Sequence, residues 1–221
     1  MNTHTIGEIT LSLSTLVYFC WFIPQIWLNF RRKNINGLSF WMHSLLLFGY
    51  TADLLYGFGR HMQWQYRFVT ITGLFFLFIQ HSQFARYGLQ TRLQKNSFMF
   101  VSIAVGIAFI YAVLNFTVLH HGKKYYDIAG FVSDLCWMTY LFPQMIKNYR
   151  AKSTIGLSIG FVILDLTLSA LDITSTFTLH WDWPSVLSEC VTVLKKSVLL
   201  FQIFYYGNNR LSNSVLREKI H

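Results

Sequence analysis

Long apolar runs follow one another along the chain, and short polar connections separate them. Each run is long enough to cross a hydrocarbon layer about 30 Å thick, which takes about 20 residues of α-helix. The pattern therefore predicts an all-α integral membrane protein with seven transmembrane helices. We expect these helices at residues 6–30, 38–58, 67–86, 98–119, 128–148, 157–179 and 184–206.

The composition indicates that lipid forms much of the surroundings of the chain. Of its 221 residues, 53% are hydrophobic and only 12% are charged, whereas about 25% of an average soluble domain is charged. Seven helices with short turns use most of this length, so we expect no separate soluble domain. No basic cluster precedes the first helix and no small-residue cleavage site follows it, so we expect this helix to be retained.

The positive charges predict the orientation of the helices. The formal net charge is +9, but most Lys and Arg residues lie in short connections, where they act as topology signals rather than as contacts to nucleic acid. We therefore expect no nucleic-acid partner. Twelve lie on one side and four on the other, which predicts a cytosolic C-terminus and an N-terminus outside the cell or in a lumen. The twelve are Arg31, Arg32, Lys33, Arg86, Arg92, Lys95, Lys147, Arg150, Lys152, Arg210, Arg217 and Lys219, and the four are Arg60, Arg67, Lys123 and Lys124.

One segment of the chain occurs twice. Residues 22–31 and 141–150 share a Pro-Gln pair, an Asn and an Arg at the same spacing, 119 residues apart. The match continues through a Gly-Leu-Ser triplet to residue 64 and its counterpart without a gap. It predicts a 3+1+3 arrangement, in which one linker helix keeps two three-helix bundles parallel. The predicted segments are a first repeat at 1–95, a linker helix at 96–124, a second repeat at 125–210 and a cytosolic tail at 211–221.

The two Pro-Gln pairs lie near the ends of the first and fifth predicted helices. Proline inside a helix removes a backbone hydrogen bond and bends the helix. Two parallel bundles are a known framework for alternating access, in which a solute binds between the halves near the middle of the membrane. Pro24 and Pro143 are therefore candidate matched hinges. The neighbouring Gln25 and Gln144 are candidate gating residues, and the alternative is a static kink at each proline.

These motifs resemble the PQ-loop transporter family, which includes cystinosin-like proteins, lysosomal cationic amino-acid transporters and, more distantly, the SWEET sugar transporters. The Pro-Gln pairs and the Gly-Leu-Ser triplets carry this resemblance over nearly the whole chain. Residues 152–160 and 164–167 are most similar to the cystinosin-like branch. The resemblance implies proton-coupled movement of an amino acid, whether cystine, a cationic or another amino acid, from a lumen or the exterior to the cytosol. It also implies that Asp165 is the proton-coupling group.

Several positions depart from the pattern of the cystinosin-like branch. The resemblance implies a solute pocket at the positions of Tyr140, Phe161 and Lys196, where that branch carries other residue types. The identity of the amino acid therefore stays open. The alternatives are a sugar transporter and a non-transporting receptor or nutrient sensor of the same fold. The long luminal segment and sorting tail of animal members have no counterpart here, which favours a bacterial inner membrane, or a lysosomal membrane if the source is eukaryotic.

Charged side chains at membrane depth are rare, and they mark functional sites. Asp165 and Asp172 are seven residues apart, so they share one face of the sixth helix. Carboxyl groups kept from water suit a proton carrier, and both residues are candidates for proton coupling. The alternative is a structural pair with Lys195 or Lys196 of the seventh helix. These lysines are adjacent, so we expect only one of them to face the interior.

Other polar and aromatic residues are weaker candidates for contact with the solute. A membrane histidine such as His43 is alternatively an interhelical hydrogen-bonding group. The alternative for Trp41 and Phe161 is contact with lipid. The alternative for Asp53, the repeat counterpart of Asp172, is a position in the headgroup layer. The predicted solute-binding residues are Tyr140, Phe161, Asp134, Lys196, Trp41 and His43.

Motifs for catalysis are absent from the sequence, which has no Walker loop, no zinc-protease motif and no nucleophile elbow. We therefore expect no enzyme, no cofactor and no metal. The driving force would be an ion gradient or the gradient of the solute itself. The expected partners are a small solute, protons and membrane lipid, and we expect a monomer because two bundles can enclose a complete path.

Overall fold

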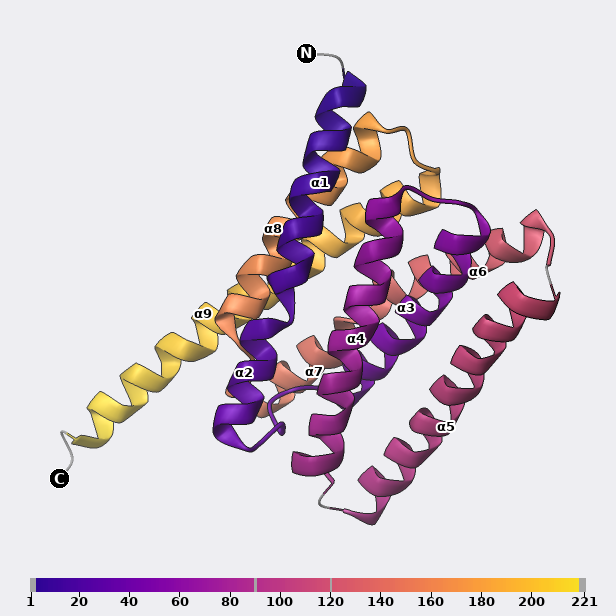
Figure 1. Cartoon of the computed structure of the whole chain (residues 1–221). Coiled ribbons are helices and arrows are strands. Elements are labelled where there is room, and N and C mark those ends of the chain that lie inside the picture. Colours follow the sequence, from indigo (N-terminus) through magenta and orange to yellow (C-terminus); the bar gives the residue numbers. More distant parts are fainter. Residues whose placement is uncertain (1–2, 90, 120, 219–221) are drawn as a thin grey trace.

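The computed structural model describes residues 3–89, 91–119 and 121–218, with side chains up to residue 206. Within these residues the chain forms helices and short connections without a strand (Figure 1). Seven membrane-length segments connect the two ends of the molecule, which confirms the predicted all-α, seven-helix fold. Four helical stretches are apolar enough to cross a membrane by composition alone, namely Thr3–Arg32, Trp64–Tyr87, Arg92–Leu119 and Ile159–Thr178.

The first repeat contains four helices because its first transmembrane segment is broken. The span predicted over 6–30 is present as Thr3–Arg32, and it is interrupted at Phe22. The elements of the first repeat are α1 (Thr3–Trp21), α2 (Ile23–Arg32), α3 (Phe40–Gly59) and α4 (Trp64–Tyr87).

The linker helix and the second repeat follow the same plan. The predicted helix over 128–148 is also broken, and the last helix passes its predicted end at residue 206. The predicted tail is helical up to Glu218, and residues 219–221 lie outside the described residues. The elements are α5 (Arg92–Leu114) with a terminal π-helical turn η1 (Asn115–Leu119), then α6 (Lys123–Thr139), α7 (Phe142–Ala151), α8 (Ile159–Thr178) and α9 (Trp183–Glu218).

Each helix break ends two residues before a proline. Phe22 and Leu141 precede the short helices, and both keep right-handed helical backbone angles. Pro24 and Pro143 then occupy the first turns of α2 and α7, where a missing N–H costs no helical hydrogen bond. Each break is therefore a local interruption of a nearly continuous path, and the proline lies in the first turn that follows it.

Each Gly-Leu-Ser triplet lies at the end of a connection, and its serine caps the helix that follows. After α2 and α7 the chain turns through left-handed backbone angles at Lys33 (φ 48°) and Lys152 (φ 46°). Ser39 then caps α3 and Ser158 caps α8, because each hydroxyl accepts a hydrogen bond from a backbone N–H three residues later. Matching sequence thus produces matching turns in both repeats.

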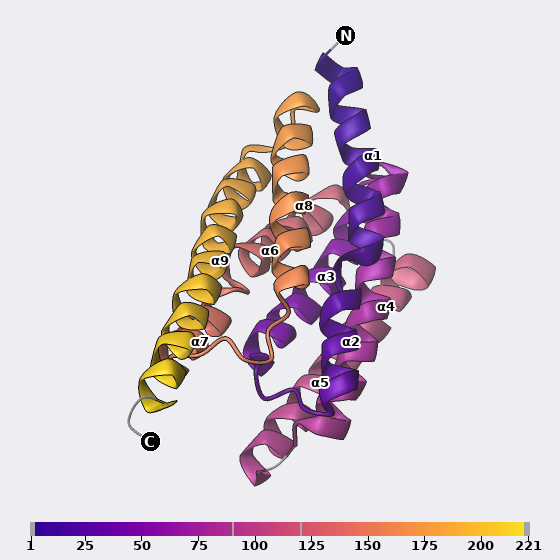
Figure 2. The ribbon, with the colours of Figure 1, turned by 90° about the vertical axis from the view of Figure 1, so that its left-hand side faces the viewer.

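The two repeats meet along two equivalent helix pairs. α1 packs against α8, and α3 packs against α6. α4 packs within the first repeat on α1 and α3, and α9 packs within the second on α6 and α8. Figure 2 shows α8 and α9 beside each other, with α1, α2 and α4 on the opposite side. The linker α5 contacts α3 at the edge of the molecule (Figure 1).

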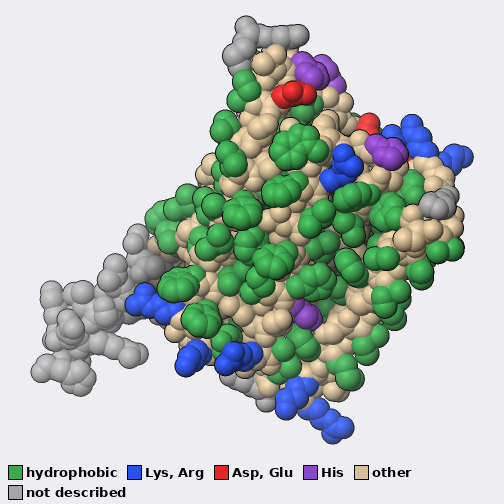
Figure 3. All heavy atoms as spheres, in the orientation of Figure 1, with side chains coloured by type: hydrophobic (Ala, Val, Ile, Leu, Met, Phe, Trp, Pro, Cys, Tyr) green, Lys and Arg blue, Asp and Glu red, His purple; other side chains and the backbone are tan. Residues whose placement is uncertain are grey.

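The outer surface suits lipid around the middle and water at the ends. Figure 3 shows apolar side chains over the central part of this face and Lys and Arg gathered at its lower end, where α2 and the beginning of α5 lie. We call the end that holds α2, α7 and the two Gly-Leu-Ser connections the Pro-Gln end. The other end, which holds the beginning of α1 and the α3–α4 and α8–α9 connections, is the cavity end.

Candidate functional site

The Pro-Gln glutamines join the two repeats at the Pro-Gln end. The Gln25 side chain donates a hydrogen bond to the Gly156 carbonyl (2.9 Å) and accepts one from the Ser158 N–H (2.8 Å). Both partners belong to the second repeat. Each glutamine amide offers a donor and an acceptor, so this residue satisfies two backbone groups of the opposite connection at once.

Gln144 makes the reciprocal contacts. Its side chain donates to the Gly37 carbonyl (3.0 Å) and accepts from the Ser39 N–H (2.6 Å), and both partners belong to the first repeat. Lys147 adds a further bond across the same interface, to the Leu38 carbonyl (2.8 Å). We call the four bonds of Gln25 and Gln144 the reciprocal amide clamp.

Each clamp glutamine is held in place by a second amide of its own repeat. Gln25 donates to Asn29, which donates to Gln83 of α4 (2.8 and 2.9 Å). Gln144 donates to Asn148 in the same way, and Asn148 donates to Gln202 of α9 (2.8 and 3.1 Å). These amides occupy equivalent repeat positions, so the repeat conserves the polar chain as well as the turns.

Backbone contact closes the Pro-Gln end. A Cβ atom on Gly37 would lie 2.1 Å from the Ile155 carbonyl oxygen, and one on Gly156 would lie 2.8 Å from the Gly37 Cα. Gly156 also has a positive φ of 92°, which a side chain would make unfavourable. Glycine at both positions lets the two connections touch where the repeats meet.

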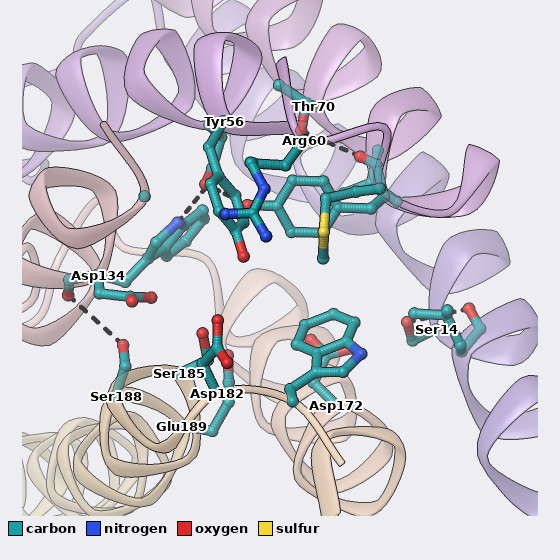
Figure 4. Close-up of a pocket in the computed structure, with 18 of the residues that line it drawn as sticks. Ser14, Tyr56, Arg60, Thr70, Asp134, Asp172, Asp182, Ser185, Ser188 and Glu189 are labelled. Carbon is teal, nitrogen blue, oxygen red and sulfur yellow. Dashed lines mark hydrogen bonds between the residues drawn. The ribbon is translucent and has the colours of Figure 1, made fainter. Parts of the chain in front are cut away.

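The opposite end contains a cavity between the repeats. It has a volume of about 240 Å³ and is lined by α1, α3, α4, α6, α8 and α9 together with the α8–α9 connection. Figure 4 shows Asp134, Asp182 and Glu189 across the cavity from Tyr56 of α3 and from Arg60, which directly follows α3. The polar and charged lining residues are Ser14, Tyr18, Tyr50, Asp53, Tyr56, Arg60, Tyr66, Thr70, Asp134, Trp137, Asp172, His180, Trp181, Asp182, Ser185, Ser188 and Glu189.

Asp53 is fixed in the cavity wall by three donors. Its carboxylate accepts hydrogen bonds from the Tyr66 hydroxyl, the Ser133 hydroxyl (2.6 Å) and the Trp137 indole N–H (2.9 Å). Ser133 and Trp137 lie on α6, so this carboxylate also links the repeats. Three donors satisfy a buried carboxylate without a cation.

Asp172 lies at the equivalent position of the second repeat. It lines the same cavity and accepts a hydrogen bond from the Tyr18 hydroxyl of α1 (2.9 Å). Asp53 and Asp172 thus each bind a tyrosine, and they come from opposite halves of the molecule. The sequence contained this signal, because the two residues match in the repeat.

Asp165 lies deeper and forms an ion pair. Its side chain is fully buried and its Oδ1 lies 2.8 Å from Nζ of Lys196, which is 4% exposed. Lys196 also donates to Ser169 (2.6 Å), and the Tyr140 hydroxyl donates to Asp165 (3.2 Å). Asp165 does not line the cavity. The interhelical pair anticipated as an alternative role of Asp165 is therefore present.

The expectation that only one adjacent lysine faces the interior was wrong. Lys195 is 3% exposed and Lys196 is 4% exposed. Lys195 donates to the carbonyls of Trp137 and Met138 (2.6 and 2.5 Å), which lie in the last turn of α6 before its break. Carbonyls at the end of a helix lack helical donors, and they attract a cation. Lys195 therefore binds the end of α6, whereas Lys196 binds Asp165 and Ser169 of α8.

Aromatic side chains separate the cavity from the clamp. Trp21 and Phe161 stack with ring centroids 5.3 Å apart, and Trp21 also contacts Phe22 (4.4 Å). All three are buried, as are Tyr140 and Leu141 at the equivalent break. Nζ of Lys196, the partner of Asp165, lies 5.9 Å from a ring centroid of Trp21, so the ion pair lies beside these rings.

A family comparison identifies the repeats. The family model for the PQ loop repeat matches residues 6–66 and 125–185, which together are more than half of the chain. The chain belongs to the PQ-loop family. The matched residues include both Pro-Gln pairs, both halves of the reciprocal amide clamp and the carboxylates Asp53, Asp165 and Asp172.

PQ-loop proteins of the cystinosin type are among the curated relatives. Cystinosin of Drosophila melanogaster is 30% identical over 90% of this chain and 59% of its own length. A cystinosin homologue of Caenorhabditis elegans is 28% identical over 78% of this chain and 48% of its own. A vacuolar histidine transporter of Saccharomyces cerevisiae is 25% identical over 46% of this chain. The chain spans about half the length of the curated cystinosin relatives it matches.

A solved structure shares the PQ-loop fold of this chain. A eukaryotic SWEET transporter superposes with a TM-score of 0.66 at 13% identity, over 91% of this chain and 99% of its own. At this identity the likeness establishes the fold, including the 3+1+3 order of the helices.

The predicted solute-binding residues fall into four places in the PQ-loop fold. Asp134 lines the cavity. Tyr140, Phe161 and Lys196 are buried beneath it, and His43 is buried in a hydrogen-bonded group described below. Trp41 is 58% exposed on the outer surface, away from the cavity. The predicted role of Trp41 in a pocket therefore has no support in the structure.

His43 binds helices of the first repeat to the linker. Its Nδ1 lies 3.0 Å from Gln80 Oε1, its Nε2 lies 3.0 Å from Nδ1 of His81, and the other ring nitrogen of His81 lies 2.8 Å from the Ser102 hydroxyl of α5. This interhelical hydrogen bonding was the alternative considered for His43. It fastens α5 to α3 and α4 without a contact to the cavity.

Proposed function

We propose that this PQ-loop protein moves an amino acid across the membrane by alternating access, coupled to protons. The observation that carries the proposal is the contrast between the two ends. A polar cavity opens between the repeats at the cavity end, while the reciprocal amide clamp and backbone contact close the Pro-Gln end. A site that can be reached from one side at a time is the requirement of alternating access.

The size and lining of the cavity support a small polar solute. Its volume of about 240 Å³ is below the range of about 300–1,000 Å³ for sites of drug-sized ligands. Hydroxyl, indole and carboxyl groups line it, together with aromatic rings. The names of the curated relatives, cystinosin and a vacuolar histidine transporter, favour an amino acid over a sugar.

The proposed cycle starts with the cavity present between the repeats and the Pro-Gln end closed. By the positive-inside rule, the cavity end faces the exterior or a lumen and the Pro-Gln end faces the cytosol. Solute entering the cavity would draw the two repeats together at the cavity end. Opening to the cytosol then requires the four bonds of the clamp to break, with the interruptions at Phe22 and Leu141 taking up the bend.

Asp165 is the proposed proton-coupling group. Protonation of this carboxyl would remove the charge that Lys196 neutralises, and a buried ammonium without its partner is costly. Asp172 lies two turns further along α8, roughly 10 Å away by helix geometry, and it lines the cavity. Lys196 would then turn towards Asp172. In this way, protonation of Asp165 would change the charge of the cavity wall.

Uptake into proteoliposomes tests the proposal. With an acidic medium at the cavity end, the protein should accumulate labelled amino acid, and Asp165→Asn should abolish the dependence on the proton gradient while the protein stays folded. Glu8→Gln, which changes an exposed carboxyl at the beginning of α1, is the matched control. Gradient-driven uptake that persists in Asp165→Asn would refute the coupling role. Binding without any flux in the unmodified protein would indicate a receptor instead of a transporter.

A further inference from the structure

The two repeats match closely around the carboxylates of the cavity wall. The Trp137 indole donates to Asp53 (2.9 Å), and at the equivalent positions the Tyr18 hydroxyl donates to Asp172 (2.9 Å). Both members of one pair lie 119 residues from their counterparts in the other. The same offset extends along α4 and α9 to the glutamines behind the clamp. Residues at equivalent positions of the two repeats can therefore be compared directly.

Beneath the cavity, charged side chains of the second repeat correspond to apolar ones of the first. The buried ion pair of Asp165 and Lys196 corresponds to Leu46 and Leu77, which are 2% and 0% exposed. A buried ion pair is stable only in a well-defined geometry, whereas the packing of apolar side chains is not directional. The interior of the second repeat is therefore more tightly constrained at these positions.

Lys195 joins the break of the second repeat to α9. Its ammonium donates to the carbonyls of Trp137 and Met138 (2.6 and 2.5 Å) and lies 5.1 Å from the ring centroid of Tyr140. Thr192, one turn earlier on α9, also donates to the Trp137 carbonyl (3.3 Å). A bend at the break moves these carbonyls relative to α9. A buried ammonium that loses its acceptors is costly, so these bonds oppose the bend.

The equivalent position of the first repeat is occupied by Phe76 of α4. Its ring contacts Phe19 and Phe22, with the ring centroids 6.2 Å apart in each pair. Phe22 is the residue at the break of the first repeat. Because apolar contacts are not directional, the Phe76 ring can stay in contact while this break bends. The two breaks therefore differ in what opposes their movement.

We propose that Lys195 is a positioning residue that fastens the second break to α9, so that the first break bends more readily than the second when the Pro-Gln end opens. The inference rests on the proposed function in taking this end to open, and it adds an order to the movement. Partial opening moves α2 relative to α4 while α7 keeps its place on α9. Complete opening then requires Lys195 to leave its two carbonyls.

Distances between spin labels at repeat-equivalent positions test the inference. The first pair joins α2 to α4 at Phe30 and Phe75, and the second joins α7 to α9 at Tyr149 and Leu194. All four side chains are exposed, so labels there leave the core intact. The labels are attached to cysteines at these positions in the full chain without its three native cysteines. Double electron–electron resonance in lipid nanodiscs then gives the distribution of distances within each pair.

Removal of the clamp exposes the difference between the breaks. Gln25→Ala together with Gln144→Ala deletes the clamp bonds from both repeats alike. The distribution of the first pair should then broaden or shift, whereas that of the second should not change, because Lys195 still holds the second break. An equal change in the two pairs, including no change in either, would overturn the proposal. This comparison keeps Lys195 in place, so it is decisive even if substitution of the buried lysine prevents folding.

Lys195→Met, added to the clamp variant, removes the ammonium and keeps a side chain of similar length. The second pair should then broaden as the first pair does, with no further change in the first. A general loosening of the fold would instead broaden both pairs. Lys124→Met, at an exposed lysine at the beginning of α6, is the matched control and should change neither pair. A second pair that stays unchanged in Lys195→Met, or that broadens only together with the first, would overturn the role of Lys195.

Flux measured on the same variants separates this inference from the proposed function. Amino-acid flux together with equal movement in the two pairs would overturn the role of Lys195 and leave amino-acid transport standing. Unequal movement without flux of any amino acid would support the role of Lys195 and overturn the proposed transport.

Discussion

At the scale of single residues, burial separates carboxylates that the sequence places together. The seven-residue spacing correctly put Asp165 and Asp172 on one face of a helix. Spacing does not reveal depth behind other side chains, and the stack of Trp21 on Phe161 comes from helices far apart in the sequence. One carboxylate consequently pairs with Lys196, and the other lines the cavity.

Removing one member of the buried ion pair should be more harmful than removing both. Lys196→Met leaves Asp165 without a cation in a site with no exposure, and the expected loss is about 3–5 kcal/mol of folding stability. The double variant with Asp165→Asn should recover most of this loss, because no buried charge is left unpaired. Thermal unfolding of the purified variants in detergent measures the effect. Additive losses in the double variant would show that the two groups are not coupled.

At the scale of elements, the hydropathy pattern located every transmembrane segment and missed the two breaks. The apolar run continues across Phe22 and Leu141, so nothing in its hydropathy marks the end of α1 or α6. The prolines marked the correct places, but a static kink and an interruption have the same sequence signal. The repeat predicted paired glutamines, and their partners became visible only in the fold, because they lie in the opposite repeat.

The amide clamp should control access from the Pro-Gln end. Gln144→Ala leaves the Ser39 N–H and the Gly37 carbonyl without partners, which weakens the closed state. A cysteine in place of the buried Leu38, in a background without the three native cysteines, reports on opening. A membrane-impermeant maleimide should label it several-fold faster when Gln144→Ala is present. Equal labelling rates with and without this substitution would show that the clamp does not hold the end closed.

The prolines should affect movement more than binding. Pro24 and Pro143 lie in the first turns of α2 and α7, away from the cavity lining. Pro→Ala at either position allows a more continuous helix across the break, so the conformational step should slow while the pocket is unchanged. We expect the maximal transport rate to fall several-fold with little change in solute affinity, measured by uptake and by calorimetry on the same preparation. Rate and affinity that fall in proportion would indicate damage to the fold.

At the scale of the whole molecule, the repeat was sufficient to predict the architecture and insufficient to predict the site. Two parallel three-helix units and a linker followed from residue matches and an odd helix count. The pairing of α1 with α8 and of α3 with α6 did not, because it depends on how the units face each other. The cavity lies between these pairs, so Tyr50, Arg60 and Glu189 could not be assigned to one site from the sequence.

The direction of the proposed transport depends on the orientation of the molecule. Lys and Arg in short connections lie mainly at the Pro-Gln end, and the positive-inside rule is strongest for short connections. We therefore expect the Pro-Gln end and the C-terminus in the cytosol, with the cavity open to the exterior or a lumen. A reporter that is fluorescent only in the cytosol should be active when fused after His221. An alkaline-phosphatase fusion at the same point should be inactive, because that enzyme requires export. The reverse pair of results would place the cavity on the cytosolic side, and solute would then enter it from the cytosol and leave through the clamp.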